Sequence, residues 1–176
     1  MYAKRTRWAS VLAVLLGASP LAALAEAPAL HANLAYEHLV VARAGEKSIS
    51  EPGLVADLAF GIPLGSQAHL GNVGLRVGKG EEGDRIAPHL FLRVLGGDER
   101  WKTFFDLGLL GRIQPSWSAG MRMGIGVQRE LNEFLGLYAV AGAAAGFGEA
   151  FHIGFDGGIG LQFRFGSSDV LVDYVH

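Results

Sequence analysis

The chain has 176 residues with no break in composition, and this length predicts a single domain. A formal net charge of −2 excludes the basic surface of a nucleic-acid-binding protein, and the absence of cysteine excludes disulfide and thiolate chemistry. Because 50% of the residues are hydrophobic, the folded chain must cover a large apolar surface with a core or with lipid.

The N-terminus has the three parts of a secretory signal peptide. Lys4, Arg5 and Arg7 make a basic start, an apolar run follows over residues 9–16, and a small-residue Ala-Leu-Ala site ends at Ala25. We therefore expect residues 1–25 to be removed on export and residues 26–176 to form one β-barrel domain. No later stretch approaches the roughly 18 consecutive apolar residues of a membrane-spanning helix.

The first segment of the expected domain is the least regular of the predicted strands. Over residues 32–43, Glu37 and His38 stand side by side and blur the alternation, so a helix is an alternative there. Residues 44–53 then predict a loop from their Gly, Lys, Ser and Pro content.

The rest of the chain alternates apolar residues with glycine or polar residues, most cleanly from Phe151 to Phe165. A period of two is that of a β-strand, because successive side chains leave opposite faces of the pleat. This pattern predicts seven further strands, at residues 54–62, 69–79, 88–95, 101–113, 117–128, 135–147 and 151–165. Turns or loops are expected at residues 63–67, 80–85, 96–99, 130–133 and 148–149.

Eight strands of about ten residues, joined in sequence by short turns, predict an all-β fold with antiparallel neighbours. Such a meander must close or protect its edges, and strands of this length with a dyad apolar pattern are typical of a lipid-spanning barrel. The sequence therefore predicts an up-and-down transmembrane β-barrel of eight strands.

The distribution of glycine predicts that the polar face points inward. An eight-stranded barrel has little interior room, so long charged side chains fit there only beside small neighbours. On the apolar face, aromatic residues fall near the strand ends, as in the belts at membrane interfaces. If the first strand starts in the periplasm, one end carries Phe60, Trp101, Phe163 and Phe165, and the other carries Trp117, Phe147 and Phe151. A soluble periplasmic barrel of the lipocalin type and a sandwich are the alternatives.

Two phrases, GVQRELNEFLGLYA and GIGLQFRF, add a resemblance to this pattern. The first resembles a strand, periplasmic turn and strand, and the second the closing strand, of the small Gram-negative outer-membrane barrels of the OmpA/OmpX-like or OmpW-like group. The resemblance implies an outer-membrane location, contact with outer-membrane lipid and lipopolysaccharide, and handling by the barrel-assembly machinery. Such proteins usually end on an aromatic residue, whereas this chain continues past Phe165. Residues 166–176 are a tail or an extra strand that replaces residues 32–43 in the barrel.

The inward face carries charges of both signs, which must pair where water is scarce. We expect an Arg–carboxylate network that plugs the lumen, and structural packing is favoured over an ion path. The expected lumen residues are Asp57, Asn72, Arg76, Arg93, Asp106, Arg112, Arg122, Gln128, Asp156, Gln162 and Arg164.

His152 is the residue that raises an enzyme hypothesis, because the outer-membrane lipid A deacylases pair a His with a Ser two residues later. Here that position is Gly154, and the strand contains no Ser to be activated. The other histidines show no metal-ligand spacing, and Glu81, Glu82 and Asp84 are explained more simply by an exposed turn than by a cation site. No cofactor, metal or catalytic residue is predicted.

The sequence thus predicts a monomeric, non-enzymatic outer-membrane barrel with a role in envelope structure or interaction. A lipid A acyl hydrolase and a soluble periplasmic binder of an apolar ligand are the alternative functions.

Overall fold

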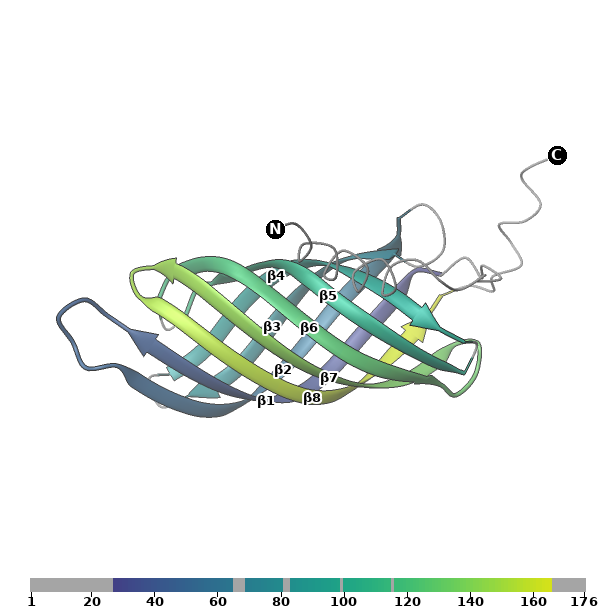
Figure 1. Ribbon diagram of the computed structural model, residues 1–176, viewed down its shortest axis with the longest axis horizontal. Helices are drawn as coiled ribbons and strands as arrows, with labels where there is room; N and C mark the ends of the chain where they lie inside the picture. The colour runs from purple at the N-terminus through teal and green to yellow at the C-terminus, as the bar shows by residue number, and fades with distance from the viewer. Residues whose placement is uncertain (1–26, 65–68, 81–82, 99, 115, 166–176) are drawn as a thin grey trace, which may run out of the picture.

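The computed structural model describes residues 27–64, 69–80, 83–98, 100–114 and 116–165. These residues form a single closed barrel in the order β1 to β8 (Figure 1). The strands are β1 (Ala29–Ala42), β2 (Ile49–Pro63), β3 (His69–Gly80), β4 (Gly83–Gly97), β5 (Trp101–Arg112), β6 (Ser118–Glu130), β7 (Leu135–Gly148) and β8 (Phe151–Arg164).

Every strand pairs antiparallel with its neighbour in sequence, and β1 closes the barrel against β8. The predicted eight-stranded up-and-down barrel is therefore confirmed. We call the end where β1 begins and β8 ends the terminal end. The opposite end, where β1 leads to β2 and β7 leads to β8, is the hairpin end.

The two faces of the barrel have opposite polarity. In β8, His152, Asp156 and Gln162 are buried in the lumen, while Phe155 and Ile159 are 58% and 65% exposed on the outside. The same alternation holds around the barrel, so large apolar side chains form a continuous outer belt and charged side chains fill the interior. This is the inverse of a water-soluble protein, in which charged residues are seldom fully buried.

Glycines on the inward face make room for the larger lumen side chains. A Cβ at Gly126 would lie 2.2 Å from the Phe104 ring, and a Cβ at Gly74 would lie 2.2 Å from Nε2 of His89. In both cases a backbone carbonyl oxygen also lies within 2.7 Å, so the glycine cannot be replaced by a simple side-chain shift. These two positions support the expectation that a narrow charged lumen requires small neighbours.

Three details of the predicted strand boundaries were wrong. Residues 44–53 are not all loop, because β2 already begins at Ile49 and pairs along β1. Residues 80–85 are not all loop either, because β4 begins at Gly83 and carries Arg85 into the lumen. Six of the strands are also longer than predicted, while β5 and β8 each end one residue earlier than predicted.

The sequence left open whether residues 32–43 or residues 166–176 supply a strand of the barrel, and the structure answers this for residues 32–43. Residues 32–43 are neither a helix nor replaced by the tail, because β1 pairs with both β2 and β8 over its whole length. The possible extra strand in residues 166–176 and the signal peptide of residues 1–25 lie outside the described residues.

Candidate functional site: the charged lumen

The largest group of polar contacts in the lumen centres on Arg76 of β3. Its Nη1 donates to Asp156 Oδ2 at 3.0 Å and to Glu37 Oε1 at 3.4 Å, and its Nε donates to Asp57 Oδ2 at 3.3 Å. His89 Nε2 lies 3.1 Å from the other oxygen of Asp57. One guanidinium therefore connects carboxylates from β1, β2 and β8.

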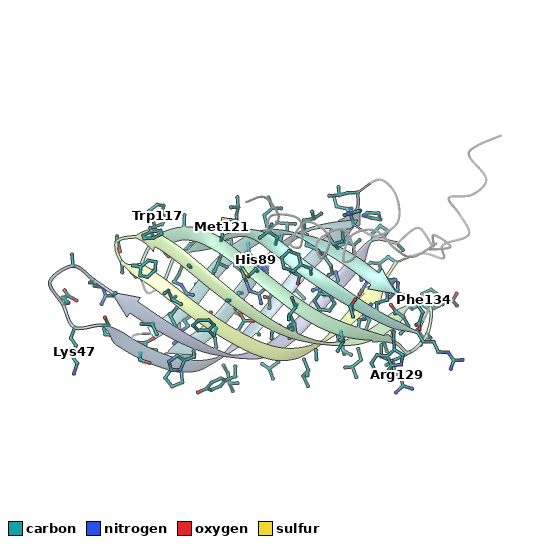
Figure 2. All side chains as sticks on the ribbon, in the orientation of Figure 1. Lys47, His89, Trp117, Met121, Arg129 and Phe134 are labelled. Carbon is teal, nitrogen blue, oxygen red and sulfur yellow. The ribbon has the colours of Figure 1, made fainter. Side chains whose placement is uncertain are left out.

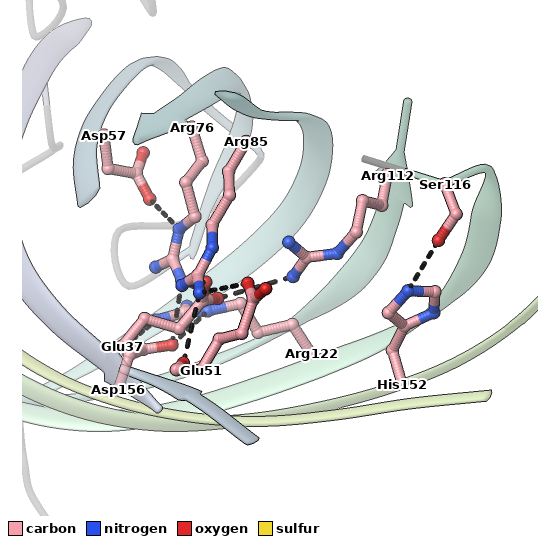
Figure 3. Close-up of polar contacts among 10 residues, drawn as sticks. All are labelled: Glu37, Glu51, Asp57, Arg76, Arg85, Arg112, Ser116, Arg122, His152 and Asp156. Atoms are coloured by element: carbon pink, nitrogen blue, oxygen red, sulfur yellow. Dashed lines mark hydrogen bonds and ion pairs between the residues drawn. The ribbon is translucent and has the colours of Figure 1, made fainter. Parts of the chain in front are cut away.

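Arg85 of β4 extends this group toward the hairpin end. Its Nη1 donates to Glu37 Oε2 at 3.0 Å, and its Nη2 donates to Glu51 Oε2 at 3.0 Å and to the Glu51 carbonyl oxygen at 3.1 Å. Arg112 Nη2 adds a third contact to Glu37, at 3.5 Å from Oε1. Figure 3 shows Arg76 and Arg85 pointing toward Glu37 from the opposite side of the close-up.

Arg122 of β6 completes the group by binding Asp156 with both a 2.6 Å and a 3.3 Å hydrogen bond. Strand β7 supplies no charge but supplies space, because a Cβ at Gly142 would lie 2.7 Å from Nη2 of Arg122. We call these residues the eight-residue network: Glu37, Glu51, Asp57, Arg76, Arg85, Arg112, Arg122 and Asp156.

The eight-residue network is balanced in charge, since its four arginines face four carboxylates. Its members come from every strand except β7. Buried ions lose their hydration, and this cost is offset only where opposite charges and hydrogen bonds replace water. The network therefore ties distant parts of the wall together across the lumen.

A second cluster lies nearer the terminal end, around Arg93 of β4. Its guanidinium makes a bidentate pair with Asp106 of β5, at 2.8 and 2.9 Å. The guanidinium carbon lies 3.9 Å from the Phe104 ring centroid and 5.2 Å from that of Tyr138, within the range of cation–π contacts. With His31, these residues form the arginine–aromatic cluster.

His31 in this cluster has a defined hydrogen-bonding role. Nη1 of Arg93 lies 3.1 Å from His31 Nδ1, and a guanidinium can only donate. His31 Nδ1 therefore accepts, which leaves a neutral ring with its proton on Nε2. A charged imidazolium would lose this bond and face the arginine directly.

A third set of charges closes the terminal end of the lumen. Glu130 of β6 lies 3.4 Å from Lys102 Nζ of β5, forms an ion pair with Arg164 of β8, and accepts a 2.8 Å hydrogen bond from Gln128. Gln128 and Gln162 are fully buried beside it. Charged or amide side chains thus occupy the lumen near its terminal end as well as in its middle.

Two cavities in the lumen are small. One of about 20 Å³ lies between the eight-residue network and the arginine–aromatic cluster, lined by residues of both, including Asp57, Arg93 and Arg122. Another, of about 10 Å³, lies toward the hairpin end beside Arg112 and His152. Cavities of this size hold about one water molecule each, and neither has room for a solute.

His152 has a serine partner that the sequence reasoning missed. The hydroxyl of Ser116, from the β5–β6 connection, lies 3.1 Å from Nε2 of His152 (Figure 3). Ser116 lies on the connection between β5 and β6, so the residues of β8 alone do not reveal it. Both side chains are buried, Ser116 at 6% and His152 at 4% exposure, and the adjoining cavity is too small for an acyl chain.

Most of the outward aromatic residues lie near the two ends of the barrel, while Tyr36, Phe105 and Phe155 lie on the outer face between them. Figure 2 shows Trp117 at one end and Arg129 with Phe134 at the other. Trp101 lies at the terminal end under Arg129, whose guanidinium carbon is 5.6 Å from the ring centroid, and Phe147 and Phe151 stack at the hairpin end with centroids 4.7 Å apart. Phe60, Phe163 and Phe165, at 40% to 55% exposure, lie on the outside at the terminal end.

The structure places all the expected lumen residues on the inward face, with Asp57 and Arg164 less completely buried than the others. Sequence reasoning missed Glu37, Glu51 and Arg85, which it had assigned to an irregular strand and to two loops. It also missed His31, His89, Phe104 and Tyr138. Asn72 and Gln162 lie in the lumen outside the two clusters, and Asn72 donates to the Leu70 carbonyl oxygen at 2.9 Å.

Among the described residues, no three His, Asp or Glu side chains gather in a way that could hold a metal ion. Asp84 of the acidic stretch is exposed at the start of β4, while Glu81 and Glu82 lie outside the described residues. No helix in the described part of the chain is long and apolar enough to cross a membrane.

Comparison of the barrel with solved structures finds clear similarity in fold. Neisserial surface protein A matches with a TM-score of 0.64 at 11% sequence identity, over 78% of this chain and 97% of that one. The chain has the fold of the small eight-stranded outer-membrane barrels.

Two further structures match less closely. OprG, an outer membrane protein of Pseudomonas aeruginosa, has a TM-score of 0.46 at 12% identity over 82% of this chain and 100% of its own. Ail of Yersinia pestis has a TM-score of 0.46 at 13% identity over 78% and 99%. No protein-family model matches the chain, and a search of curated proteins found no similar sequence.

Proposed function

We propose that the chain is an integral outer-membrane β-barrel with a closed lumen, whose role in the envelope rests on the barrel itself and not on catalysis in its interior. The observation that carries this proposal is the inverted polarity of the two faces. Outward residues such as Leu54, Ile125 and Ile159 are 62%, 64% and 65% exposed, while Arg76 and Glu37 are 2% and 1% exposed. Exposing this belt to water would be unfavourable along the whole barrel, whereas lipid tails would cover it.

The partners that suit this surface are membrane lipids. Outer-membrane phospholipid and lipopolysaccharide would cover the belt, with the aromatic residues at its two ends level with the headgroups. Export through a cleaved signal peptide and insertion by the barrel-assembly machinery would bring the chain there. Closure of the sheet leaves no strand edge along the middle of the barrel, which fits a monomer.

The ion pairs support a closed lumen in preference to a diffusion pore. An eight-stranded barrel is only wide enough for its side chains to fill, and here charged groups do fill it. A solute would have to break several buried ion pairs in order to pass. We therefore propose a structural or interaction role, with the lumen serving to hold the wall rigid.

A soluble periplasmic binder of an apolar ligand is less well supported. Such a protein needs an apolar interior cavity, while the two cavities described above are small and adjoin charged side chains. The apolar surface lies outside.

The test of this proposal combines cell fractionation with a gel comparison of unheated and boiled protein. We expect the mature chain in the outer-membrane fraction, and a folded barrel that migrates differently until it is boiled. A soluble periplasmic protein with no heat-dependent shift would overturn the proposal. Planar-bilayer recordings test the closed lumen separately, because sustained stepwise ion conductance by the unmodified protein would contradict it.

A further inference from the structure

The outer face of the barrel carries a second serine–histidine pair, separate from the buried one. The Oγ of Ser50, the second residue of β2, lies 2.8 Å from Nε2 of His38 in β1. Both side chains are exposed, while their neighbours Leu39 and Glu51 point into the lumen. The pair therefore lies outside the barrel, near its hairpin end.

The pair lies at the border of the apolar belt that faces the hairpin end. His38 is paired in register with Phe155 of β8, which is 58% exposed, and Tyr36 and Leu54 on the same outer face are 56% and 62% exposed. On the other side of the pair, the β1–β2 connection is polar and exposed and includes Glu46 and Lys47. In a bilayer, the ester groups of the lipids lie between the acyl chains and the headgroups, which is where a border between an apolar belt and a polar loop would lie.

The Ser50 side chain is exposed on the outer face. Among the described residues, the pairing of β2 with β3 begins at Leu54 and Lys79, and β1 is the described strand that pairs with β2 at Ser50. Lys79 is exposed on the same outer face, where an anionic headgroup would be attracted. A lipid that approaches Ser50 from this face would lay its acyl chain along Leu54.

We propose that Ser50 and His38 form a nucleophile and general base that act on acyl esters of membrane lipids at the outer face of the barrel. A serine hydroxyl is a weak nucleophile until an adjacent base takes its proton, and a 2.8 Å contact to imidazole provides that base. This activity goes beyond the structural role proposed above and uses none of the lumen residues.

The reaction needs only the lipid and water. Ser50 Oγ attacks the ester carbonyl carbon while its proton passes to His38 Nε2, and collapse of the tetrahedral intermediate breaks the bond to the lipid alcohol, which leaves with that proton. The acyl group is then bound to Ser50 as an ester. Water attacks this ester with His38 again taking the proton, which releases the fatty acid and restores the serine hydroxyl.

The first experiment uses a long-chain alkyl fluorophosphonate on the folded protein in detergent micelles, with the labelled residue located by mass spectrometry. We expect label on Ser50 and no label at that position in Ser50→Ala. The loss of a general base should slow labelling of His38→Gln by at least roughly a hundredfold. The heat-dependent gel shift of each variant confirms that it is folded, so that failure of this activity is distinguishable from failure of the barrel proposal.

The buried pair provides a matched control, since it has the same chemistry without access. Ser116→Ala should be labelled like the unmodified protein. Absence of label on folded protein, or equal labelling rates in His38→Gln and the unmodified chain, would overturn the proposal. Labelling that disappears in Ser116→Ala but persists in Ser50→Ala would also overturn it and would move the reactive site into the lumen.

The second experiment measures fatty-acid release from phospholipid vesicles that contain the refolded barrel. We expect release by the unmodified protein to exceed that by Ser50→Ala by at least roughly a hundredfold. Equal release by the two proteins would overturn the assignment of membrane lipid as substrate.

Discussion

The two charged clusters of the lumen are built in different ways. In the arginine–aromatic cluster, one guanidinium binds one carboxylate across a single strand pair, because Arg93 and Asp106 are direct partners in the β4–β5 register. In the eight-residue network, Glu37 receives contacts from Arg76, Arg85 and Arg112, which come from three other strands. The first cluster is a local pair covered by rings, and the second is a shared set of charges that spans the lumen.

This difference determines how each cluster should respond to mutation. A local ion pair can be removed as a unit, since its two charges cancel and its volume can be refilled with apolar side chains. A shared carboxylate cannot be removed without leaving several arginines short of a partner. The network should therefore be the more sensitive region, and the arginine–aromatic cluster the more replaceable one.

The largest effect is expected for Glu37→Gln. The substitution keeps the volume but leaves a net positive charge among four buried arginines, and breaking a buried ion pair in this way costs about 3–5 kcal/mol. The free energy of unfolding can be measured by urea titration in lipid vesicles, followed by tryptophan fluorescence. The exposed Arg43–Glu46 pair, at 3.8 Å, offers the control, because Glu46→Gln should cost no more than about 1 kcal/mol.

A second change tests whether the network acts as a shared set of charges. Arg112 makes the longest contact to Glu37, at 3.5 Å, so Arg112→Gln in the Glu37→Gln background should restore balance and recover part of the lost stability. If the double variant loses as much free energy of unfolding as the two single variants together, Glu37 and Arg112 are not coupled, and the network is not a shared set of charges.

The second prediction concerns Arg93 and Asp106. Asp106→Leu alone leaves a buried guanidinium without its carboxylate and should cost about 3 kcal/mol, whereas Arg93→Met with Asp106→Leu should cost about 1 kcal/mol or less. A double-mutant cycle on the same urea titration gives the coupling energy. A double variant less stable than either single variant would show that the aromatic cover depends on the charge.

These two clusters also mark the limit of what the sequence could predict. Period-two alternation placed Arg93 and Asp106 on the inward face of neighbouring strands, so their pairing follows from the hairpin. The partners of Glu37 depend on how the closed barrel aligns β1 with β3, β4 and β5 across the lumen, which no local pattern records. The fold and the inward residues were therefore predictable, and the connections of the network were not.

The missed residues have physical reasons. Glu37 was obscured because the inward residues that follow it, Leu39 and Val41, are apolar and pack with Ala150 near the hairpin end. With both faces of β1 apolar there, the alternation is lost. Arg85 lies in a charge-rich stretch that resembles a loop, yet β4 already begins at Gly83.

The third prediction is smaller and concerns the boundary of the network at the hairpin end. His152→Ala leaves the buried Ser116 hydroxyl without this hydrogen bond and should cost about 1–3 kcal/mol, the usual cost of an unsatisfied buried polar group. If the buried pair has no catalytic role, lipid A from cells with this variant should have the same acyl pattern as lipid A from the wild-type strain, whatever the pattern of the deletion strain. A pattern in which the variant matches the deletion strain and both differ from the wild type would instead make His152 catalytic.

The smallest effect is expected for a charge outside both clusters, in the turn between β4 and β5. The Asp98 carboxylate accepts backbone hydrogen bonds from Trp101 at 2.6 Å and from Arg100 at 2.9 Å. These bonds, the one from Trp101 first, hold the pKa of the carboxyl below its usual value. Because the folded pKa is the lower one, the stabilisation is present above the unfolded pKa of about 3.9 and is lost as the pH falls through the folded pKa.

Hydrogen exchange of the Trp101 amide can test this turn without unfolding the barrel. After correction for the intrinsic effect of pH, protection of that amide should fall as Asp98 is protonated, and Asp98→Asn should remove the dependence. An unchanged dependence in Asp98→Asn would assign it to another group. Since water surrounds Asp98, Asp98→Asn should leave the urea midpoint of unfolding almost unchanged, whereas Glu37→Gln should lower it. The cost of removing a carboxylate from this barrel should therefore follow the number of buried arginines that depend on it, more closely than the length of its hydrogen bonds.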